Sequence, residues 1–183
     1  YYHHRIPFWD TVMMRPDYDL WWQRRDAGQY LRHVKPATLV VGGWYDAEDQ
    51  WGAVHTYEQI ETLNTPNSNT LVMGPWYHGA WSDSGIDHLG AIPFGANTSD
   101  WYQRNVEAPF FLHYLKDAPW TPLPEALLFD AGTREWLSFS RWPAPEAQPL
   151  KIYFRADDSL SFTSPGDSGG SYAYLSDPAH PVP

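Results

Sequence analysis

Two short apolar runs, rich in β-branched residues, flank a single amphipathic helical pattern in this sequence. The runs cover residues 37–43 and 70–75, and apolar side chains recur at helical spacing in residues 53–63 between them. Continuous apolar runs of this length are typical of strands buried on both faces, as in a parallel sheet. The order strand, helix, strand therefore predicts a βαβ unit with two neighbouring parallel strands.

The regions before and after this unit have different hydrophobic patterns. Residues 7–35 have a polar-aromatic helical pattern, and a further helix is predicted over residues 101–116. After the Pro-rich stretch at residues 119–124, no helical period returns. Short apolar runs, separated by Pro, Gly, Asp and Ser, follow instead at 126–129, 136–139 and 150–154. This pattern predicts an α/β region followed by an antiparallel sandwich or jelly roll, with the boundary near residues 119–124.

Composition excludes several classes of function. The formal net charge is -10 and the 12 Lys and Arg residues are scattered, which argues against nucleic acid or an anionic membrane surface as partner. Mean hydropathy is -0.53, and no apolar run reaches the roughly 18 residues of a membrane-spanning helix. There is no Cys, so a disulfide framework, a thiolate metal site and a cysteine nucleophile are excluded. Aromatic residues make up 17% of the chain, enough to line an apolar pocket or to fill a core.

Chemistry-bearing side chains follow both predicted parallel strands. Asp46 lies in the loop after the first strand, and His78 lies in the loop after the second. Ligands bind beyond the carboxyl ends of parallel strands, and acid before base is the chain order of the α/β-hydrolase triad. Each residue alone would be read as a turn or surface residue. Their placement at matched strand ends favours a catalytic pair, with Asp46 orienting the imidazole of His78.

A serine nucleophile is missing from the expected context. No serine lies in a G-x-S-x-G elbow between a strand and a helix, and the glycines around Ser168 fall in a predicted loop of the β region. We therefore expect the nucleophile to precede residue 1 and the chain by itself to be inactive. The abrupt start and the Pro-rich end are expected to be cuts through a longer protein. His55 and Glu58 lie one helical turn apart but lack a third ligand, so we predict no metal and no cofactor.

Several linked motifs extend over nearly the whole chain. They are residues 42–46 (GGWYD), 74–79 (GPWYHG), 107–111 (EAPFF) and 132–136 (GTREW), with Tyr-Leu-Lys at 114–116 and Trp-Pro at 142–143. In kind and order they resemble the CocE/NonD hydrolases, which include cocaine-esterase-like enzymes and α-amino acid ester hydrolases and belong with the X-Pro dipeptidyl-peptidases.

The resemblance implies the end of a helical cap over residues 1–35, the C-terminal part of an α/β-hydrolase domain over 36–120, and the start of a truncated C-terminal jelly roll over 121–183. It implies that Asp46 is the catalytic acid and His78 the general base, with the serine and an oxyanion-hole tyrosine upstream. It also implies a periplasmic or secreted location. The oligomeric state stays open, a homo-oligomer included.

Glu48 and Asp49 match the positions of an acidic pair in the α-amino acid ester hydrolases, where it holds the α-ammonium of the substrate. The alternative is a solvated acidic loop, or caps for the following helix, where negative charge is favourable. The four aromatic residues that precede Asp46 and His78 are expected to contact substrate as well: Trp44, Tyr45, Trp76 and Tyr77.

The leading hypothesis is therefore a serine hydrolase for small-molecule esters or amides with an α-amino acyl group, such as α-amino acid esters or β-lactam antibiotics. Alternatives with the same chemistry are an X-Pro dipeptidyl-peptidase and a cocaine-esterase-like or glutaryl-acylase-like enzyme. An alternative of another class is a carbohydrate-binding module built on an aromatic-rich jelly roll, which would leave the Asp46 and His78 placement as coincidence.

Overall fold

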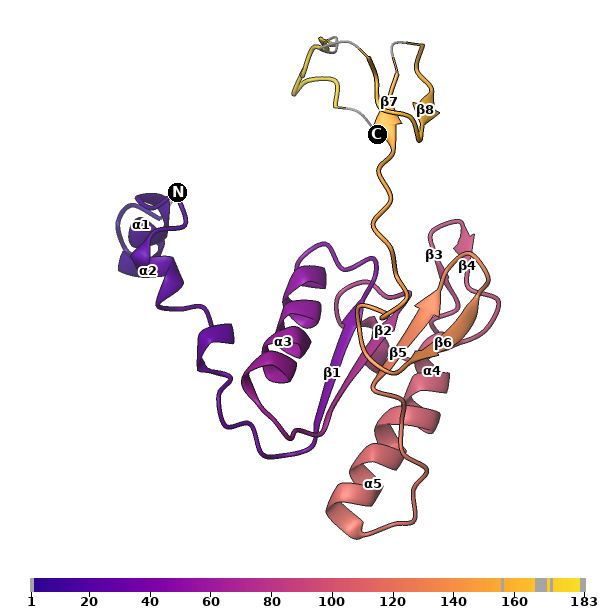
Figure 1. The fold of residues 1–183 in the computed structure, drawn as a ribbon. Coiled ribbons are helices and arrows are strands. Elements are labelled where there is room, and N and C mark those ends of the chain that lie inside the picture. Colours follow the sequence, from indigo (N-terminus) through magenta and orange to yellow (C-terminus); the bar gives the residue numbers. More distant parts are fainter. Residues whose placement is uncertain (1, 156, 167–170, 172, 182–183) are drawn as a thin grey trace. The chain divides into compact units, whose positions relative to one another are not determined.

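A computed structural model describes residues 2–155, 157–166, 171 and 173–181, and the chain forms two compact units, Tyr1–Pro145 and Glu146–Pro183. The first unit contains a four-stranded sheet in the order β1-β2-β5-β6 (Figure 1). Its strands are β1 (Thr38–Gly43), β2 (Asn69–Gly74), β5 (Ala126–Asp130) and β6 (Glu135–Phe139). β1 pairs with β2 in parallel, β2 pairs with β5 in parallel, and β5 pairs with β6 antiparallel.

The predicted βαβ unit is confirmed. α3 (Gln50–Leu63) connects β1 to β2, and the register places Thr38 opposite Asn69 and Gly43 opposite Gly74. The two strands therefore end at the same level of the sheet. The loops that follow them leave the sheet side by side, which is the arrangement that the sequence pattern predicts.

Side chains of the sheet alternate between two apolar cores, as the two-residue period of a strand requires. On one face, Leu71 and Met73 of β2 pack with Tyr57 and Ile60 of α3. On the other face, Val72 packs with residues of a second helical segment and with buried aromatic rings. Burial on both faces explains why β1 and β2 are continuous apolar runs in the sequence.

The second helical segment runs from residue 98 to residue 116. It consists of α4 (Thr98–Tyr102), a π-helical turn η3 (Gln103–Glu107) and α5 (Ala108–Lys116). The side chain of Asn97 accepts a hydrogen bond from the backbone N–H of Asp100, which caps the start of α4. The helix predicted over residues 101–116 is thus present, and it begins three residues earlier than predicted.

The strands at residues 126–130 and 135–139 require a correction. The sequence pattern assigned them to an antiparallel β region after a boundary near residues 119–124. In the structure β5 lies parallel to β2, with Leu71, Val72 and Met73 opposite Ala126, Leu127 and Leu128. Both β5 and β6 therefore extend the α/β sheet, and the first unit continues to Pro145.

The remaining elements are short. The N-terminal region contains α1 (Pro7–Met13), α2 (Leu20–Gln23) and η1 (Gly28–Tyr30), and the loop after β2 contains η2 (Ala80–Ser82), β3 (His88–Leu89) and β4 (Ile92–Pro93). In the second unit, β7 (Tyr153–Phe154) pairs antiparallel with β8 (Leu160–Ser161). The predicted loop around Ser168 falls at residues 167–170, outside the described residues. Within the part of the chain that the structure describes, no helix is long and apolar enough to cross a membrane.

Candidate active site

Asp46 and His78 meet beyond the carboxyl ends of β1 and β2. Nδ1 of His78 lies 2.9 Å from Oδ2 of Asp46. Because a carboxylate can only accept, Nδ1 carries the proton and Nε2 is the free basic atom of the neutral ring. No hydrogen bond to Nε2 occurs among the described residues. The pair therefore has the contact that a triad needs between its acid and its base.

The carboxylate of Asp46 is fixed by the backbone that follows it. Its Oδ1 accepts hydrogen bonds from the backbone N–H groups of Glu48 at 2.8 Å and Asp49 at 3.0 Å. The side chain of Asp46 is 2% exposed, whereas that of His78 is 58% exposed. The acid is thus held in one orientation inside the loop, and the imidazole extends from it toward solvent.

The two groups shift each other's pKa in opposite directions. Burial raises the pKa of Asp46, but the two backbone N–H donors and then the bond to His78 outweigh this effect, so the pKa lies below its usual value. The pKa of His78 is raised, first by its hydrogen bond to Asp46 and then by the negative charge of that carboxylate. Both shifts favour a charged pair, which is the state that forms when His78 takes a proton from a nucleophile.

Main-chain hydrogen bonds continue past the ends of the strands and join the two loops. The backbone N–H of Trp44 donates to the carbonyl of Gly74 at 2.9 Å, and that of Tyr45 donates to the carbonyl of Trp76 at 3.1 Å. A Cβ atom on Gly43 would lie 2.1 Å from the Trp76 carbonyl oxygen. Glycine at this position therefore permits the close approach that brings Asp46 to His78.

The acidic pair lies beside the imidazole. Oε2 of Glu48 is 3.7 Å from Nδ1 of His78, and the Glu48 side chain is 76% exposed. Asp49 is also exposed and precedes the first residue of α3, but its side chain makes no capping hydrogen bond. Asp49 thus holds the N-cap position of α3 without a capping hydrogen bond, and the alternative in which its charge favours the helix start stays open. The backbone N–H groups of Glu48 and Asp49 bind Asp46.

The four aromatic residues predicted to contact substrate have different environments. Trp76 is completely buried, and its Nε1 donates to Oγ1 of Thr98 at 3.0 Å. The prediction that Trp76 contacts substrate is therefore wrong, because its ring belongs to the core beneath the site. Trp44 is half-buried and donates from Nε1 to the carbonyl of Phe129 at 2.9 Å.

The two tyrosines differ in exposure. Tyr45 is half-buried and stacks on Phe94, with ring centroids 6.3 Å apart. Tyr77 is 41% exposed and its hydroxyl donates to Asp83 at 3.1 Å. Of the four aromatic residues, Trp44, Tyr45 and Tyr77 keep some exposure to solvent, and their contact with substrate stays a prediction.

Trp81 is a neighbour of the site that the sequence pattern did not single out. Its ring lies edge-on to the ring of His78, with centroids 6.3 Å apart and planes at 66°. Trp81 follows His78 by three residues and lies in the short helical turn η2. The only sequence signal was the glycine between them, Gly79, whose φ of 79° turns the chain into η2.

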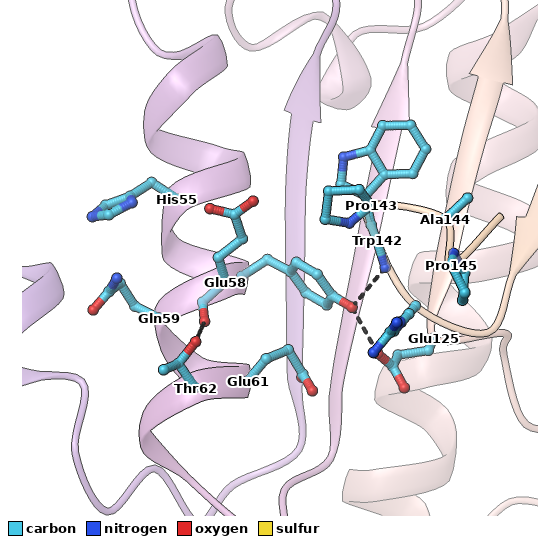
Figure 2. A pocket seen from close by; sticks show the side chains of 12 residues that line it. His55, Glu58, Gln59, Glu61, Thr62, Glu125, Trp142, Pro143, Ala144 and Pro145 are labelled. Atoms are coloured by element: carbon cyan, nitrogen blue, oxygen red, sulfur yellow. Dashed lines mark hydrogen bonds between the residues drawn. The ribbon is translucent and has the colours of Figure 1, made fainter. Parts of the chain in front are cut away.

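A pocket of about 710 Å³ lies elsewhere in the first unit, between α3 and the segment that follows β6 (Figure 2). Its lining includes Glu58 and Glu61 of α3, Glu125 before β5, and Trp142. Glu125 and residues 141–145 lie at the end of the sheet where β5 starts and β6 ends. The loops of Asp46 and His78 lie at the other end, beyond the carboxyl ends of β1 and β2. Neither member of the dyad lines this pocket.

Over the described residues, no group of three or more His, Cys, Asp or Glu side chains is placed to hold a metal ion. Asp46, Glu48 and His78 are close together, but Nδ1 of the histidine is already bonded to the aspartate.

Comparison with known proteins places this geometry in a family. The model of the X-Pro dipeptidyl-peptidase (S15) family matches residues 1–80. An aminopeptidase from the marine sediment archaeon Thaumarchaeota archaeon is 34% identical, with a TM-score of 0.88 over 99% of this chain and 30% of its own. An α-amino acid ester hydrolase labelled with selenomethionine is 31% identical, with a TM-score of 0.86 over 98% of this chain and 31% of its own.

The chain spans about a third of the length of these two solved structures. A search of curated proteins found no match. The family model covers both Asp46 and His78, and both structural matches extend over the whole sheet. The chain belongs to the X-Pro dipeptidyl-peptidase (S15) family, in its CocE/NonD-like group.

Proposed function

We propose that this chain is the acid- and base-bearing part of a serine hydrolase that cleaves esters or amides with an α-amino acyl group, such as α-amino acid esters or β-lactam antibiotics. The observation that carries the proposal is the 2.9 Å contact between Nδ1 of His78 and the buried carboxylate of Asp46. His78 would accept the proton of a serine at Nε2 and return it to the leaving group, while Asp46 stabilises the imidazolium.

The nucleophile is proposed to come from a region of the protein that precedes this sequence. No serine of the chain lies in a nucleophile elbow, and no serine hydroxyl among the described residues is bonded to His78. The family assignment supports an α/β-hydrolase domain for residues 36–145, with residues 1–35 as the end of a cap. We also propose that the second unit begins a β jelly roll.

The acidic pair supports a substrate with a positive charge. Glu48 lies beside the imidazole, where the acyl group of a bound substrate would be close to it. A carboxylate there can bind an α-ammonium through charge-assisted hydrogen bonds. Free amines of this kind occur in α-amino acid esters, in aminated β-lactams and at the N-terminus of a peptide.

A second candidate is a peptidase that acts on a free peptide N-terminus. It is favoured by the match to the S15 family model and by the structural similarity to an aminopeptidase. The same dyad and acidic pair would serve this reaction, since only the leaving group differs. A small-molecule ester or amide, or a short peptide, is the proposed binding partner in either case.

The proposal is tested in the serine-containing protein, meaning this chain together with the preceding region. His78→Ala should abolish hydrolysis of an α-amino acid ester, because no base remains to deprotonate the serine. A matched control is His55→Ala, since His55 lines the pocket between α3 and the segment that follows β6, away from the Asp46 and His78 pair. Retention of near-normal kcat by His78→Ala would remove the basis of the proposal, as would an equal loss in the control.

A further inference from the structure

The loop that carries His78 is held on both sides by one helical segment. Two residues before His78, the buried indole of Trp76 donates from Nε1 to Oγ1 of Thr98 at 3.0 Å. Three and five residues after His78, the carbonyls of Trp81 and Asp83 accept hydrogen bonds from Nε2 of Gln103, at 2.9 and 3.1 Å. Thr98 begins α4 and Gln103 begins the π-helical turn that follows it.

Thr98 is also bonded to the far end of the same loop. Its Oγ1 donates to the carbonyl of Ile86 at 3.0 Å while it accepts from Trp76, so the hydroxyl uses both of its functions. Thr98 is 1% exposed and Trp76 is fully buried. A buried hydroxyl that joins two segments in this way fixes their separation, because no water can replace it.

Gln103 lies where α4 passes into the π-helical turn. Single π-helical turns inside helices occur often at functional sites. Here the turn starts at Gln103, whose amide donates to two carbonyls of the segment that carries Trp81. The ring of Trp81 in turn lies against the ring of His78.

We propose that Thr98 and Gln103 are positioning residues that set the place of the His78 imidazole, an inference that rests on the proposed function. They act on opposite sides of His78, through Trp76 and through the segment of Trp81. Neither side chain contacts His78 itself. Because Trp76 also accepts from the backbone of Tyr45, displacement of the Trp76 end would alter the distance between His78 and Asp46.

The experiment compares two variants, each with a matched control, in the serine-containing protein. Thr98→Val removes the hydroxyl and keeps the shape, and Gln103→Met removes the amide and keeps the length. Ser99→Ala is the control for the first, because Ser99 accepts from the backbone of Ile86 but not from Trp76. Asn105→Ala is the control for the second, because its amide donates only within its own helix, to the carbonyl of Trp101.

Misplacement of a catalytic group by about 1 Å costs on the order of 10²-fold in rate, so Thr98→Val and Gln103→Met should each lower kcat between about tenfold and 10²-fold. KM should change by less than about twofold, because ground-state binding is untouched. Thr98→Ser, which keeps both hydrogen bonds, should restore kcat. Both control variants should stay within about twofold of the unmodified protein, the ordinary scatter of a site that is not coupled to the chemistry.

Three results would overturn the inference: unchanged kcat in Gln103→Met, equal losses in a variant and its control, or a change confined to KM. Gln103 is only half-buried, so its variant decides the question should Thr98→Val fail to fold. His78→Ala, run beside them, separates this inference from the proposed function. Activity lost in His78→Ala but kept in both positioning variants would overturn only the positioning roles.

Discussion

The carbonyl oxygen of Trp76 lies 2.1 Å from the point where a Cβ atom would stand on Gly43. The backbone of Gly43 therefore lies directly against that of Trp76, where the loop of Asp46 meets the loop of His78. Gly43 is the last residue of β1, and the next two residues both donate backbone hydrogen bonds to the neighbouring loop. The close approach of the two loops, and with it the contact between Asp46 and His78, therefore requires a glycine at position 43.

Replacement of Gly43 by alanine should separate the two loops. The added methyl group would meet a carbonyl oxygen of the main chain, which cannot rotate away as a side chain does. We expect kcat to fall by on the order of 10²-fold. Steady-state kinetics of the serine-containing protein measures this, with Gly166→Ala as the control because a Cβ there meets no atom of the described residues within 4 Å. An unimpaired Gly43→Ala enzyme would show that the loops can part without loss of function.

Asp46→Asn should lower the pKa of His78. The hydrogen bond from the ring to Asp46 is the largest cause of the raised pKa, followed by the charge of that carboxylate. A neutral amide removes the charge and binds the protonated ring more weakly. A pH titration of the His78 ring by NMR should therefore give a midpoint below that of the unmodified protein. The same variant should lose about 10⁴-fold in kcat, because an amide in place of the carboxylate permits the wrong tautomer. A midpoint that does not move would mean that Asp46 and His78 are not bonded in solution.

The raised pKa also makes a stability contribution that depends on pH. Because the folded-state pKa of His78 is above its ordinary value of 6.5, protonation of His78 stabilises the folded protein, fully so below the unfolded-state pKa. This contribution is lost as the pH rises through the folded-state pKa. His78→Ala should therefore destabilise the protein more at mildly acidic pH than at pH 9. Thermal unfolding at both pH values measures the difference, and a pH-independent loss would contradict it.

The acidic pair should control the choice of substrate. Replacement of Glu48 by Gln and Asp49 by Asn keeps the shapes and removes the charges, while the backbone donors to Asp46 stay in place. If bound substrate excludes water from the two carboxylates, kcat/KM for an α-amino ester should fall roughly 30-fold or more, which corresponds to a loss of about 2 kcal/mol of transition-state stabilisation. If the carboxylates stay solvated, the loss should be under about 1 kcal/mol.

The control for this change is the same ester without its amine, which should lose little activity. Hydrolysis of the α-amino ester by the unmodified protein should also weaken as the pH rises and the substrate amine loses its proton. Equal losses for both esters would mean that Glu48 and Asp49 only support the loop. The general esterase alternative would then be preferred.

Tyr57 should stabilise the first unit through its hydroxyl. The group donates to Oε1 of Glu125 at 2.7 Å and accepts from the backbone N–H of Trp142 at 3.2 Å, and the residue is fully buried. Tyr57→Phe leaves both partners without this bond, so the free energy of unfolding should fall by about 1–3 kcal/mol. Tyr30→Phe, at an exposed hydroxyl, should change it by less than about 0.5 kcal/mol. Denaturant unfolding of the two variants gives both numbers.

The sequence predicts the βαβ unit and the meeting of Asp46 with His78 because both follow from chain order. Two neighbouring parallel strands joined by one helix have their carboxyl ends on the same side of the sheet, independently of the rest of the protein. The assignment of residues 126–139 was wrong for a local reason. A run of four apolar residues has no period by which a buried parallel strand can be told from a sandwich strand.

The environment of Trp76 lay beyond the sequence pattern for a related reason. Loop residues have no regular alternation, so nothing in the order Trp76, Tyr77, His78 says that the first ring turns inward. That depends on a partner 22 residues away, Thr98, and on the space between α4 and the sheet. Pairings of this length require the packed structure.

The backbone and the side chain of Glu48 make separate contacts. Its backbone N–H holds the carboxylate of Asp46, and any amino acid except proline would supply this donor. Its side chain projects into solvent beside His78 and is not needed for that bond. Under the proposed function, mutation at this codon would alter which acyl groups are accepted while Asp46 keeps its orientation. Position 48 would then be a place where a lineage could diversify its substrates without first having to rebuild the Asp46 and His78 pair.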